Sequence, residues 1–185
     1  MSALRLVINA LGFQAAWLCA VGGAAADRVW LGPAAALALV GWHAFTAARP
    51  ARELAGVWSV AALGTAWDSV LAAAGLIEYR GGAIVASAAP YWIAALWLAF
   101  ATTLNVSLDW LRGRHALGAL LGAVAGPFCY LAADTLGALR LVAMPGALLA
   151  QAAAWAVLLP LTVALAARFD GVAAARPHAA VPSRV

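Results

Sequence analysis

Six long apolar runs, separated by short gaps, limit the folds open to this chain more than any other feature of its sequence. The runs cover residues 6–26, 30–47, 54–77, 89–110, 116–136 and 145–167. A helix needs about 20 apolar residues to cross the roughly 30 Å hydrocarbon core of a bilayer. The gaps are polar or marked by Gly and Pro, and none is long enough for a soluble insert. We therefore expect an all-α fold, a polytopic membrane bundle of six transmembrane helices.

The composition indicates the same environment. Of the 185 residues, 66% are hydrophobic and 10% are charged, and the mean hydropathy is +0.95. Soluble domains average about 45–50% apolar and about 25% charged residues. All eleven basic residues are arginines, dispersed among the gaps, so the net charge of +4 does not indicate a nucleic-acid partner. Because the chain has no lysine, it cannot form a Schiff base with retinal or pyridoxal phosphate.

The distribution of arginine predicts how the bundle is oriented. With six spans, three arginines fall on one side of the membrane and eight on the other: Arg5, Arg49, Arg52, Arg112, Arg114, Arg168, Arg176 and Arg184. Cytoplasmic loops are enriched in arginine, so the side with eight, which includes both termini, is expected to be cytoplasmic. The expected layout is one transmembrane domain over residues 1–168 and a disordered cytoplasmic tail over residues 169–185, rich in Ala, Pro and Arg.

The fifth run contains the clearest packing signal. Gly118, Gly122 and Gly126 recur every four residues and therefore keep to one side of a helix. Glycine at this spacing allows the backbone of a neighbouring helix to approach closely. We expect a close contact between helices here, with Pro127 directly after it inside the same span.

The stretch FATTLNVSLDW in the fourth run is unusually polar for a transmembrane segment. At about 100° per residue, Thr102, Asn105 and Asp109 fall on one stripe of a helix. Thr103 and Ser107 fall on the adjoining stripe. Amides and carboxylates are costly in hydrocarbon unless they are paired, so this face is expected to point into the bundle. There the hydroxyls would bond back to helix carbonyls, and Asn105 would either pair with another helix or contact a ligand.

Asp68 lies near the middle of the third run, on a face of small residues that includes Gly64 and Ala72. A carboxyl group at that depth is either protonated or paired with a donor, and ionisable residues inside a membrane are candidates for function. Four roles remain open for Asp68: a buried packing acid, a proton carrier, a catalytic acid/base, or an anchor for the hydroxyl or amine of a ligand.

Polar and aromatic residues of four runs predict a common pocket. Gln14 lies near the middle of the first run with Trp17 one turn later, and Tyr130 follows the glycines of the fifth run. We expect a ligand-binding pocket between the first, third, fourth and fifth spans. Its polar contacts would be Gln14, Asp68 and Asn105, and its apolar lining would include Trp17 and Tyr130.

Residues near the ends of the runs are expected to be interfacial. They include His43 and His115 on the inner side and Tyr79 on the outer side. Neither histidine has a second metal-binding residue at a useful spacing, and Cys19 and Cys129 lie inside apolar runs, so we expect no metal and no cofactor. The chain also lacks the GxSxG, HExxH and Gly-rich nucleotide-binding motifs, so an enzyme of this sequence would have to work with few catalytic residues.

Four segments carry a resemblance to a known family: NALGFQAAWLCAV, GTAWDSVL, PYWIAALWLAFATTLNVSLDWL and GAVAGPFCYLAADTLGAL. Over nearly all of its length except the tail, the chain resembles the bacterial inner-membrane family catalogued as domain of unknown function 2878. The positions that match the family pattern are Asn9, Gln14, Trp17, Asp68, Asn105, Ser107, Trp110, Gly126, Pro127 and Tyr130. The resemblance implies a multi-pass protein of the bacterial inner (cytoplasmic) membrane, and it implies no activity.

Four interpretations of the function stay open. The first is a protein that binds a lipid or another small amphiphile in the polar pocket, so that membrane lipid is its partner. The second is a small proton-coupled transporter or exporter, which would act as a homodimer because six helices show no evident inverted repeat. The third is an integral membrane enzyme that acts on lipid, with Asp68 as the acid/base. The last is a structural partner of another membrane protein.

Overall fold

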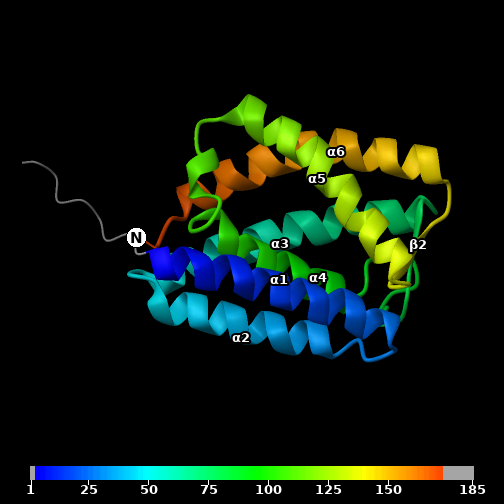
Figure 1. Cartoon of the computed structure of the whole chain (residues 1–185), viewed down its shortest axis with the longest axis horizontal. Helices are drawn as coiled ribbons and strands as arrows, with labels where there is room; N and C mark the ends of the chain where they lie inside the picture. The colour runs from blue at the N-terminus through cyan, green and yellow to red at the C-terminus, as the bar shows by residue number, and fades with distance from the viewer. Residues whose placement is uncertain (1–2, 173–185) are drawn as a thin grey trace, which may run out of the picture.

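Six helices run back and forth along one axis in the computed structural model, which describes residues 3–172 (Figure 1). The helices are α1 (Ala3–Ala25), α2 (Leu31–Thr46), α3 (Pro50–Ala73), α4 (Tyr91–Leu104), α5 (His115–Thr135) and α6 (Met144–Arg168). The connections contain two short strands, β1 (Ile77–Tyr79) and β2 (Leu139–Leu141), and a 3-10 helix, η1 (Asp109–Leu111). The predicted all-α bundle is confirmed.

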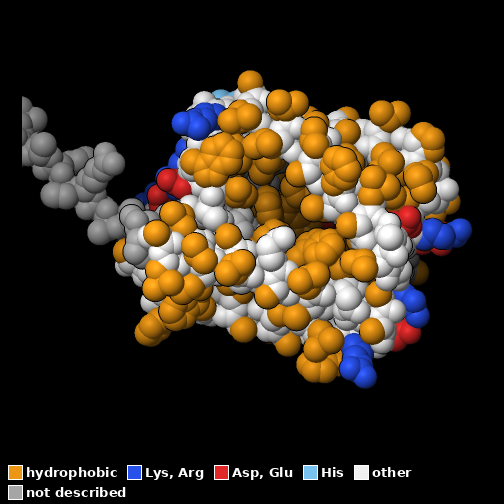
Figure 2. Space-filling model, in the orientation of Figure 1, with side chains coloured by type: hydrophobic (Ala, Val, Ile, Leu, Met, Phe, Trp, Pro, Cys, Tyr) orange, Lys and Arg blue, Asp and Glu red, His pale blue; other side chains and the backbone are white. Residues whose placement is uncertain are grey.

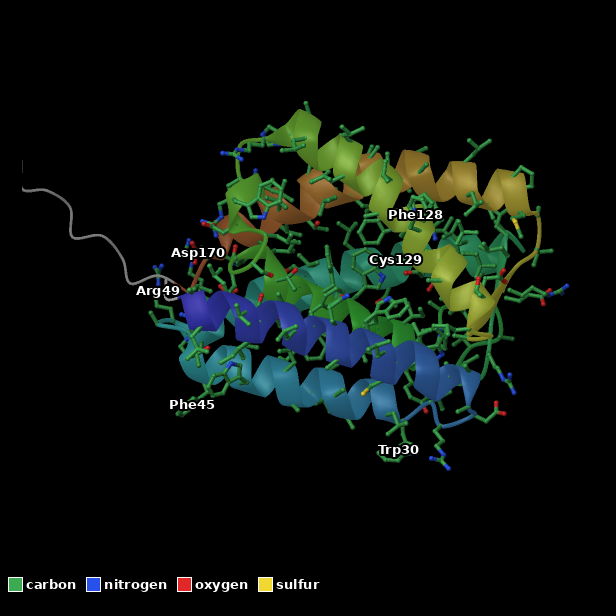
Figure 3. All side chains as sticks on the ribbon, viewed as in Figure 1. Trp30, Phe45, Arg49, Phe128, Cys129 and Asp170 are labelled. Atoms are coloured by element: carbon green, nitrogen blue, oxygen red, sulfur yellow. The ribbon has the colours of Figure 1, made fainter. Side chains whose placement is uncertain are left out.

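The helices present an apolar exterior. Four of them, α1, α3, α5 and α6, are long and apolar enough to cross a membrane, whereas α2 and α4 are shorter apolar helices of 16 and 14 residues. Large apolar side chains lie on the surface, and Phe45 is 84% exposed. Phe45 on α2 and Trp30, the residue before α2, point away from the bundle (Figure 3). An exterior of this kind is stable in lipid, and the chain is an integral membrane protein.

The first and last described helices begin and end at the same end of the bundle (Figure 1). We call this the arginine-rich end, because six arginines of the described residues belong to it: Arg5, Arg49, Arg52, Arg112, Arg114 and Arg168. The other end carries Arg28, Arg80 and Arg140 together with the two strands, and we call it the strand end. The predicted separation of charge therefore corresponds to the two ends of one bundle, although Arg176 and Arg184 lie outside the described residues.

The two strands join distant connections at the strand end. β1 pairs with β2 in antiparallel register, with Ile77 opposite Leu141 and Tyr79 opposite Leu139. Ile77 is 1% exposed, so this ribbon closes the end of the apolar core. The sequence predicted only short loops here, because strands of three residues carry too few residues to show a period of two.

Helices α5 and α6 pack closely where the glycines predicted a contact. A Cβ atom on Gly122 would overlap the backbone oxygen of Trp155, and one on Gly126 would overlap the Trp155 ring. At Gly118 a Cβ atom would lie 3.7 Å from Pro160, which is an ordinary contact distance. The predicted close approach is therefore confirmed at Gly122 and Gly126 but not at Gly118.

The ordered chain continues past α6 at the arginine-rich end. The backbone N–H of Gly171 donates to Glu53 Oε2 at 2.7 Å, and the N–H of Arg49 donates to the Gly171 oxygen at 2.9 Å. Figure 3 shows Arg49 and Asp170 beside each other there, and the Arg49 Nη2 atom donates to the Asp170 backbone oxygen at 2.9 Å. Residues 169–172 of the expected tail are thus packed against the start of α3. The rest of that tail lies outside the described residues.

Replacing Gly122 by Leu should destabilise the protein, because the new side chain has to displace the backbone of α6. The free energy of unfolding is expected to fall by about 2–3 kcal/mol, the upper range for an overpacked core. Thermal unfolding in detergent measures this change. The matched control is Gly41→Leu, since nothing lies within 4 Å of a Cβ atom placed on Gly41. Equal melting of Gly122→Leu and the control would show that the packing assignment is wrong.

Candidate functional site

The polar stretch that ends the fourth run is a break in a helix. α4 ends at Leu104, Asn105 is its C-terminal cap, and the chain then turns before η1 begins at Asp109. The prediction of one helical stripe through Thr102, Asn105 and Asp109 is therefore wrong beyond Leu104. The expected burial of Thr102 and Asn105 is confirmed, since their exposed fractions are 0% and 4%. The Thr102 hydroxyl bonds back to the helix at the Ala99 oxygen, 2.7 Å away.

A side-chain amide of α1 binds a backbone oxygen in the last turn of α4, and the amide of Asn105 in the break binds a backbone oxygen of α6. Asn9 Nδ2 of α1 donates to the Thr102 backbone oxygen at 3.1 Å, and its Oδ1 accepts from the Ser107 hydroxyl at 2.8 Å. Asn105 Nδ2 donates to the Ala166 backbone oxygen of α6 at 3.1 Å. Unpaired backbone groups are costly away from water, so the polar residues of this stretch serve first to make a buried chain break stable.

A buried cluster surrounds Glu53 beside this break. Glu53 is 1% exposed and accepts from Asn105 Nδ2 at 3.0 Å and from the Gly171 backbone, while His43 Nε2 lies 2.9 Å from its Oε1. Arg112 links Asn105 Oδ1 at 2.7 Å to the Asp170 carboxylate at 2.9 Å. We call these residues the Glu53 cluster. His43 is only 2% exposed, so its expected interfacial position is wrong.

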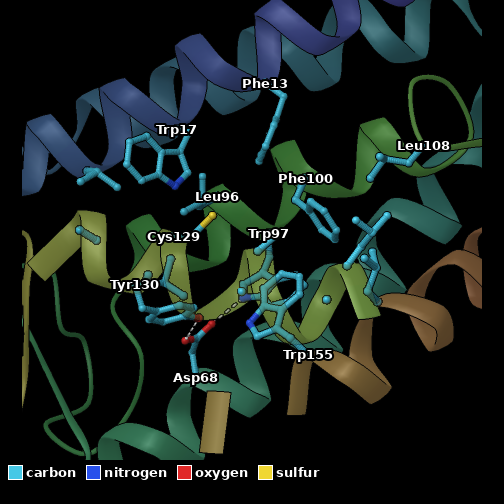
Figure 4. A pocket seen from close by; sticks show the side chains of 18 of the residues that line it. Phe13, Trp17, Asp68, Leu96, Trp97, Phe100, Leu108, Cys129, Tyr130 and Trp155 are labelled. Carbon is cyan, nitrogen blue, oxygen red and sulfur yellow. Dashed lines mark hydrogen bonds between the residues drawn. The ribbon is translucent and has the colours of Figure 1, made fainter. Parts of the chain in front are cut away.

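Asp68 forms a second, separate set of hydrogen bonds closer to the strand end. Its Oδ1 atom accepts from the hydroxyl groups of Tyr79 in β1 and Tyr130 in α5, each at 2.5 Å. Its Oδ2 atom accepts from Trp97 Nε1 of α4 at 2.6 Å (Figure 4). Asp68 itself is 0% exposed. Burial and the negative charge of Asp68 raise the pKa of Tyr79 well above its ordinary range, so this hydroxyl remains a donor.

Small residues decide where the Trp97 ring lies. A Cβ atom on Gly64 would overlap that ring, so the ring lies directly against α3, one turn before Asp68. The opposite face of Trp97 stacks on Trp155 of α6, with centroids 5.1 Å apart and planes at 12°. Phe100 meets both rings edge-on, at 5.5 Å and 5.6 Å. The carboxyl group, the missing side chain of Gly64 and the stacked rings together fix one aromatic wall.

This wall belongs to a cavity of about 310 Å³ between α1, α4, α5 and α6, which we call the slot. Seven aromatic residues line it: Phe13, Trp17, Trp92, Trp97, Phe100, Tyr130 and Trp155. Apart from Asp68, whose oxygens are engaged, the remaining lining residues are aliphatic, Gly or Cys. The volume is at the lower limit of ligand sites, which range from about 300 to 1,000 Å³.

The slot is elongated along the helix axes and open at its side. On α5 its lining extends from Leu121 to Ala133, a rise of about 18 Å along the helix. α5 packs chiefly on α6, so the slot separates α5 from α1 and α4. Figure 2 shows the hollow on the face over which α1 and α5 run. Ala125 and Cys129 line the slot and are exposed on that face, so the opening is toward the apolar exterior.

The structure divides the five predicted site residues. Trp17, Asp68 and Tyr130 line the slot as one group. Gln14 is exposed on α1, and Asn105 belongs to the Glu53 cluster. The expected shared pocket of Asp68 and Asn105 is wrong, because Asn105 follows Trp97, the partner of Asp68, by eight residues, about 12 Å along the chain of α4.

Several wall residues were missed by sequence reasoning. Phe13 and Trp17 are four residues apart on α1, and Trp97 and Phe100 are three apart on α4, so each pair shares a helix face. That spacing is a usable signal, but it does not show whether the face meets lipid, another helix or a cavity. Trp155 gave no signal, since its position depends on Gly122 and Gly126 of another helix.

The polar groups at the slot wall are few. Both carboxyl oxygens of Asp68 accept hydrogen bonds from neighbouring side chains, whereas the Trp155 Nε1 N–H is buried without a partner among the described residues. Among residues 3–172, no group of three or more His, Cys, Asp or Glu side chains could hold a metal ion. What remains is a long apolar space with aromatic walls and a lateral opening.

Comparison with known proteins agrees with the resemblance seen in the sequence. The model of a family described as "Protein of unknown function (DUF2878)" matches residues 6–161, which is most of the chain. No curated protein and no solved structure matches the chain. The match includes all the slot-lining residues and both polar clusters except Asp170 and its neighbours.

Replacing Tyr130 by Phe should weaken the link between α5 and α3, because only the hydroxyl donor to Asp68 is removed. The free energy of unfolding is expected to fall by about 1–3 kcal/mol, the cost of a lost buried hydrogen bond. Unfolding in detergent tests this. Tyr91→Phe is the control, since Tyr91 is 36% exposed and its hydroxyl has no hydrogen bond in the described part of the chain. Unchanged stability of Tyr130→Phe would mean that this bond does not hold the slot together.

Proposed function

Because the chain belongs to this family of unknown function and is an integral membrane protein, we propose that it binds a membrane lipid, one hydrocarbon chain of which occupies the slot. The observation that carries the proposal is the lateral opening of an elongated apolar slot toward the lipid-facing exterior. A hydrocarbon chain can enter from the bilayer without crossing water. In the slot, aromatic and aliphatic side chains take the place of the neighbouring lipid chains, so the free energy of transferring the hydrocarbon chain from the bilayer is small.

In this proposal Asp68 positions the wall and does not contact the ligand. Its oxygens hold Tyr130, Tyr79 and Trp97, and it is fully buried behind these rings. A polar head that bound Asp68 would have to displace one of these donors, and the Trp155 Nε1 N–H is the one buried donor of the described slot lining that has no partner. The hydrocarbon part of the lipid is therefore the part that fits the slot, and the polar head remains nearer the membrane surface.

We further propose that the protein lies in the inner membrane of a bacterium with its arginine-rich end in the cytoplasm. The described residues place six arginines at that end and three at the strand end. Both the beginning of α1 and the end of α6 lie at the arginine-rich end, as an even number of spans requires (Figure 1). The positive-inside rule then assigns this end to the cytoplasm.

Transport is the second candidate, and the break after α4 is the observation that favours it. Discontinuous helices commonly line the binding sites of secondary transporters. Here α4 ends at Leu104 and the chain resumes as η1 at Asp109. Flux of a lipid between the leaflets of proteoliposomes would identify a transporter. Conversion of lipid with turnover would instead identify an enzyme, and neither result is expected from a protein that only binds.

Reporter fusions test the orientation. A fluorescent protein fused after Val185 should fold and fluoresce in the cytoplasm, and alkaline phosphatase inserted after Gly82 should be active outside it, because the end of α6 and Gly82 lie at opposite ends of the bundle. Gly82 is in the connection between β1 and α4 at the strand end. An inactive phosphatase at Gly82 together with an active one after Val185 would reverse the proposed orientation.

Filling the slot tests lipid binding. Ala125→Trp should remove at least half of the lipid retained by the purified protein, because the indole occupies space that the hydrocarbon chain needs. Native mass spectrometry measures the lipid-bound fraction. The control is Val124→Trp, one residue earlier on α5, 49% exposed and outside the slot lining. Equal retention by the two folded variants, or no retained lipid in the wild type, would contradict the proposal.

A further inference from the structure

The two ends of the slot differ in what lies next to them. Toward the arginine-rich end the lining residues are Leu108 and Leu111, which flank Trp110 of η1. Trp110 is 49% exposed, and the Arg114 guanidinium carbon lies 6.0 Å from the centre of its ring. The Arg114 backbone N–H donates to the Leu111 oxygen at 2.9 Å, so this arginine is held one turn from the slot.

Each end has both paired and unpaired arginines. At the strand end Arg80 pairs with Asp27 at 2.7 Å and Arg140 pairs with Glu78 at 2.6 Å, whereas Arg28 is exposed and forms no ion pair within residues 3–172. At the arginine-rich end Arg112 pairs with both Asp109 and Asp170. Arg114 is exposed and forms no ion pair within residues 3–172. The mouth of the slot beside η1 therefore carries a positive charge that no acid of the described chain neutralises.

The length of the slot agrees with a lipid that enters from one leaflet. Its lining on α5 extends over about 18 Å, from Leu121 to Ala133. One leaflet contributes about 15 Å to the hydrocarbon core, half of the roughly 30 Å total. A single acyl chain that starts beside η1 would fill the slot over that depth and end near Tyr130.

We propose that the slot selects an anionic phospholipid. One acyl chain lies along α5 in the slot, and the phosphate-bearing head lies at the arginine-rich end, where Arg114 binds it. Arginine binds phosphate through several N–H donors at once, and Trp110 anchors this region at the level of the head groups. The inference rests on the proposed function, since it names the class of lipid for the same slot.

Competition between two lipids with identical acyl chains tests the proposal. The full-length protein, reconstituted in vesicles of equimolar phosphatidylglycerol and phosphatidylethanolamine, is extracted and analysed by native mass spectrometry. The bound lipid should be enriched about fivefold or more in phosphatidylglycerol, the selectivity expected from one arginine near a head group. Arg114→Gln should bring the ratio close to that of the vesicles, while Arg114→Lys should keep most of the enrichment.

The control is Arg28→Gln, which removes an exposed arginine from the strand end and should leave the enrichment unchanged. An equal loss in Arg28→Gln and Arg114→Gln would overturn the assignment to Arg114. A wild-type protein that retains both lipids equally, and loses both in Ala125→Trp, would overturn the head-group inference and leave the proposed function standing. Absence of any retained lipid would overturn the proposed function itself. The Arg28 and Arg114 variants should melt like the wild type, because both arginines are exposed.

Discussion

The arrangement of the bundle depends on the hydrogen bonds that satisfy one buried carboxyl group, that of Asp68. A carboxylate in an apolar interior is costly unless donors surround it, and here the donors come from β1, α4 and α5. The hydrogen bond from Tyr130 matters most for the position of α5, because α5 otherwise packs chiefly on α6. It connects α5 directly to α3 beside the slot, while α6 packs on α3 and α4 by itself. Satisfying one buried carboxyl group therefore also fixes where α5 lies beside the cavity.

The second polar region, which includes the Glu53 cluster, stabilises the break in the chain after α4. α4 is too short to reach the arginine-rich end, and the turn that follows leaves backbone groups without helical partners. Asn9 of α1 binds one of these groups, the Thr102 oxygen, and Glu53 binds Asn105, His43 and the backbone of Gly171. A polar residue in a membrane segment is often taken as a sign of a binding site. In this protein Asn9, Thr102 and Ser107 form hydrogen bonds around the chain break, and the slot is lined by apolar side chains apart from Asp68.

The same packing that closes the bundle creates the slot. Gly122 and Gly126 admit Trp155 against α5, and Gly64 admits Trp97 against α3, so two indole rings stack in the centre of the bundle. The slot lies between these rings, α5, and the side chains that α1 and α4 contribute to its lining. The opening is toward the apolar exterior. The proposed binding of a hydrocarbon chain depends on this geometry.

The sequence by itself determined the six helices, the apolar exterior, the separation of arginines between two ends and the glycine contact at Gly122 and Gly126. These features depend on the hydrophobic periodicity and the composition of single segments of about 20 residues, which can be read directly from the sequence. It also placed Asp68, Trp17 and Tyr130 near one another, since the depth of each residue follows from its position along a span. Only the tertiary structure decided where α4 ends, that Glu53 meets His43, and that Asp68 and Asn105 belong to different clusters. Those outcomes depend on donors that lie far away along the chain, such as Gly171 for Glu53, and local patterns contain no information about such partners.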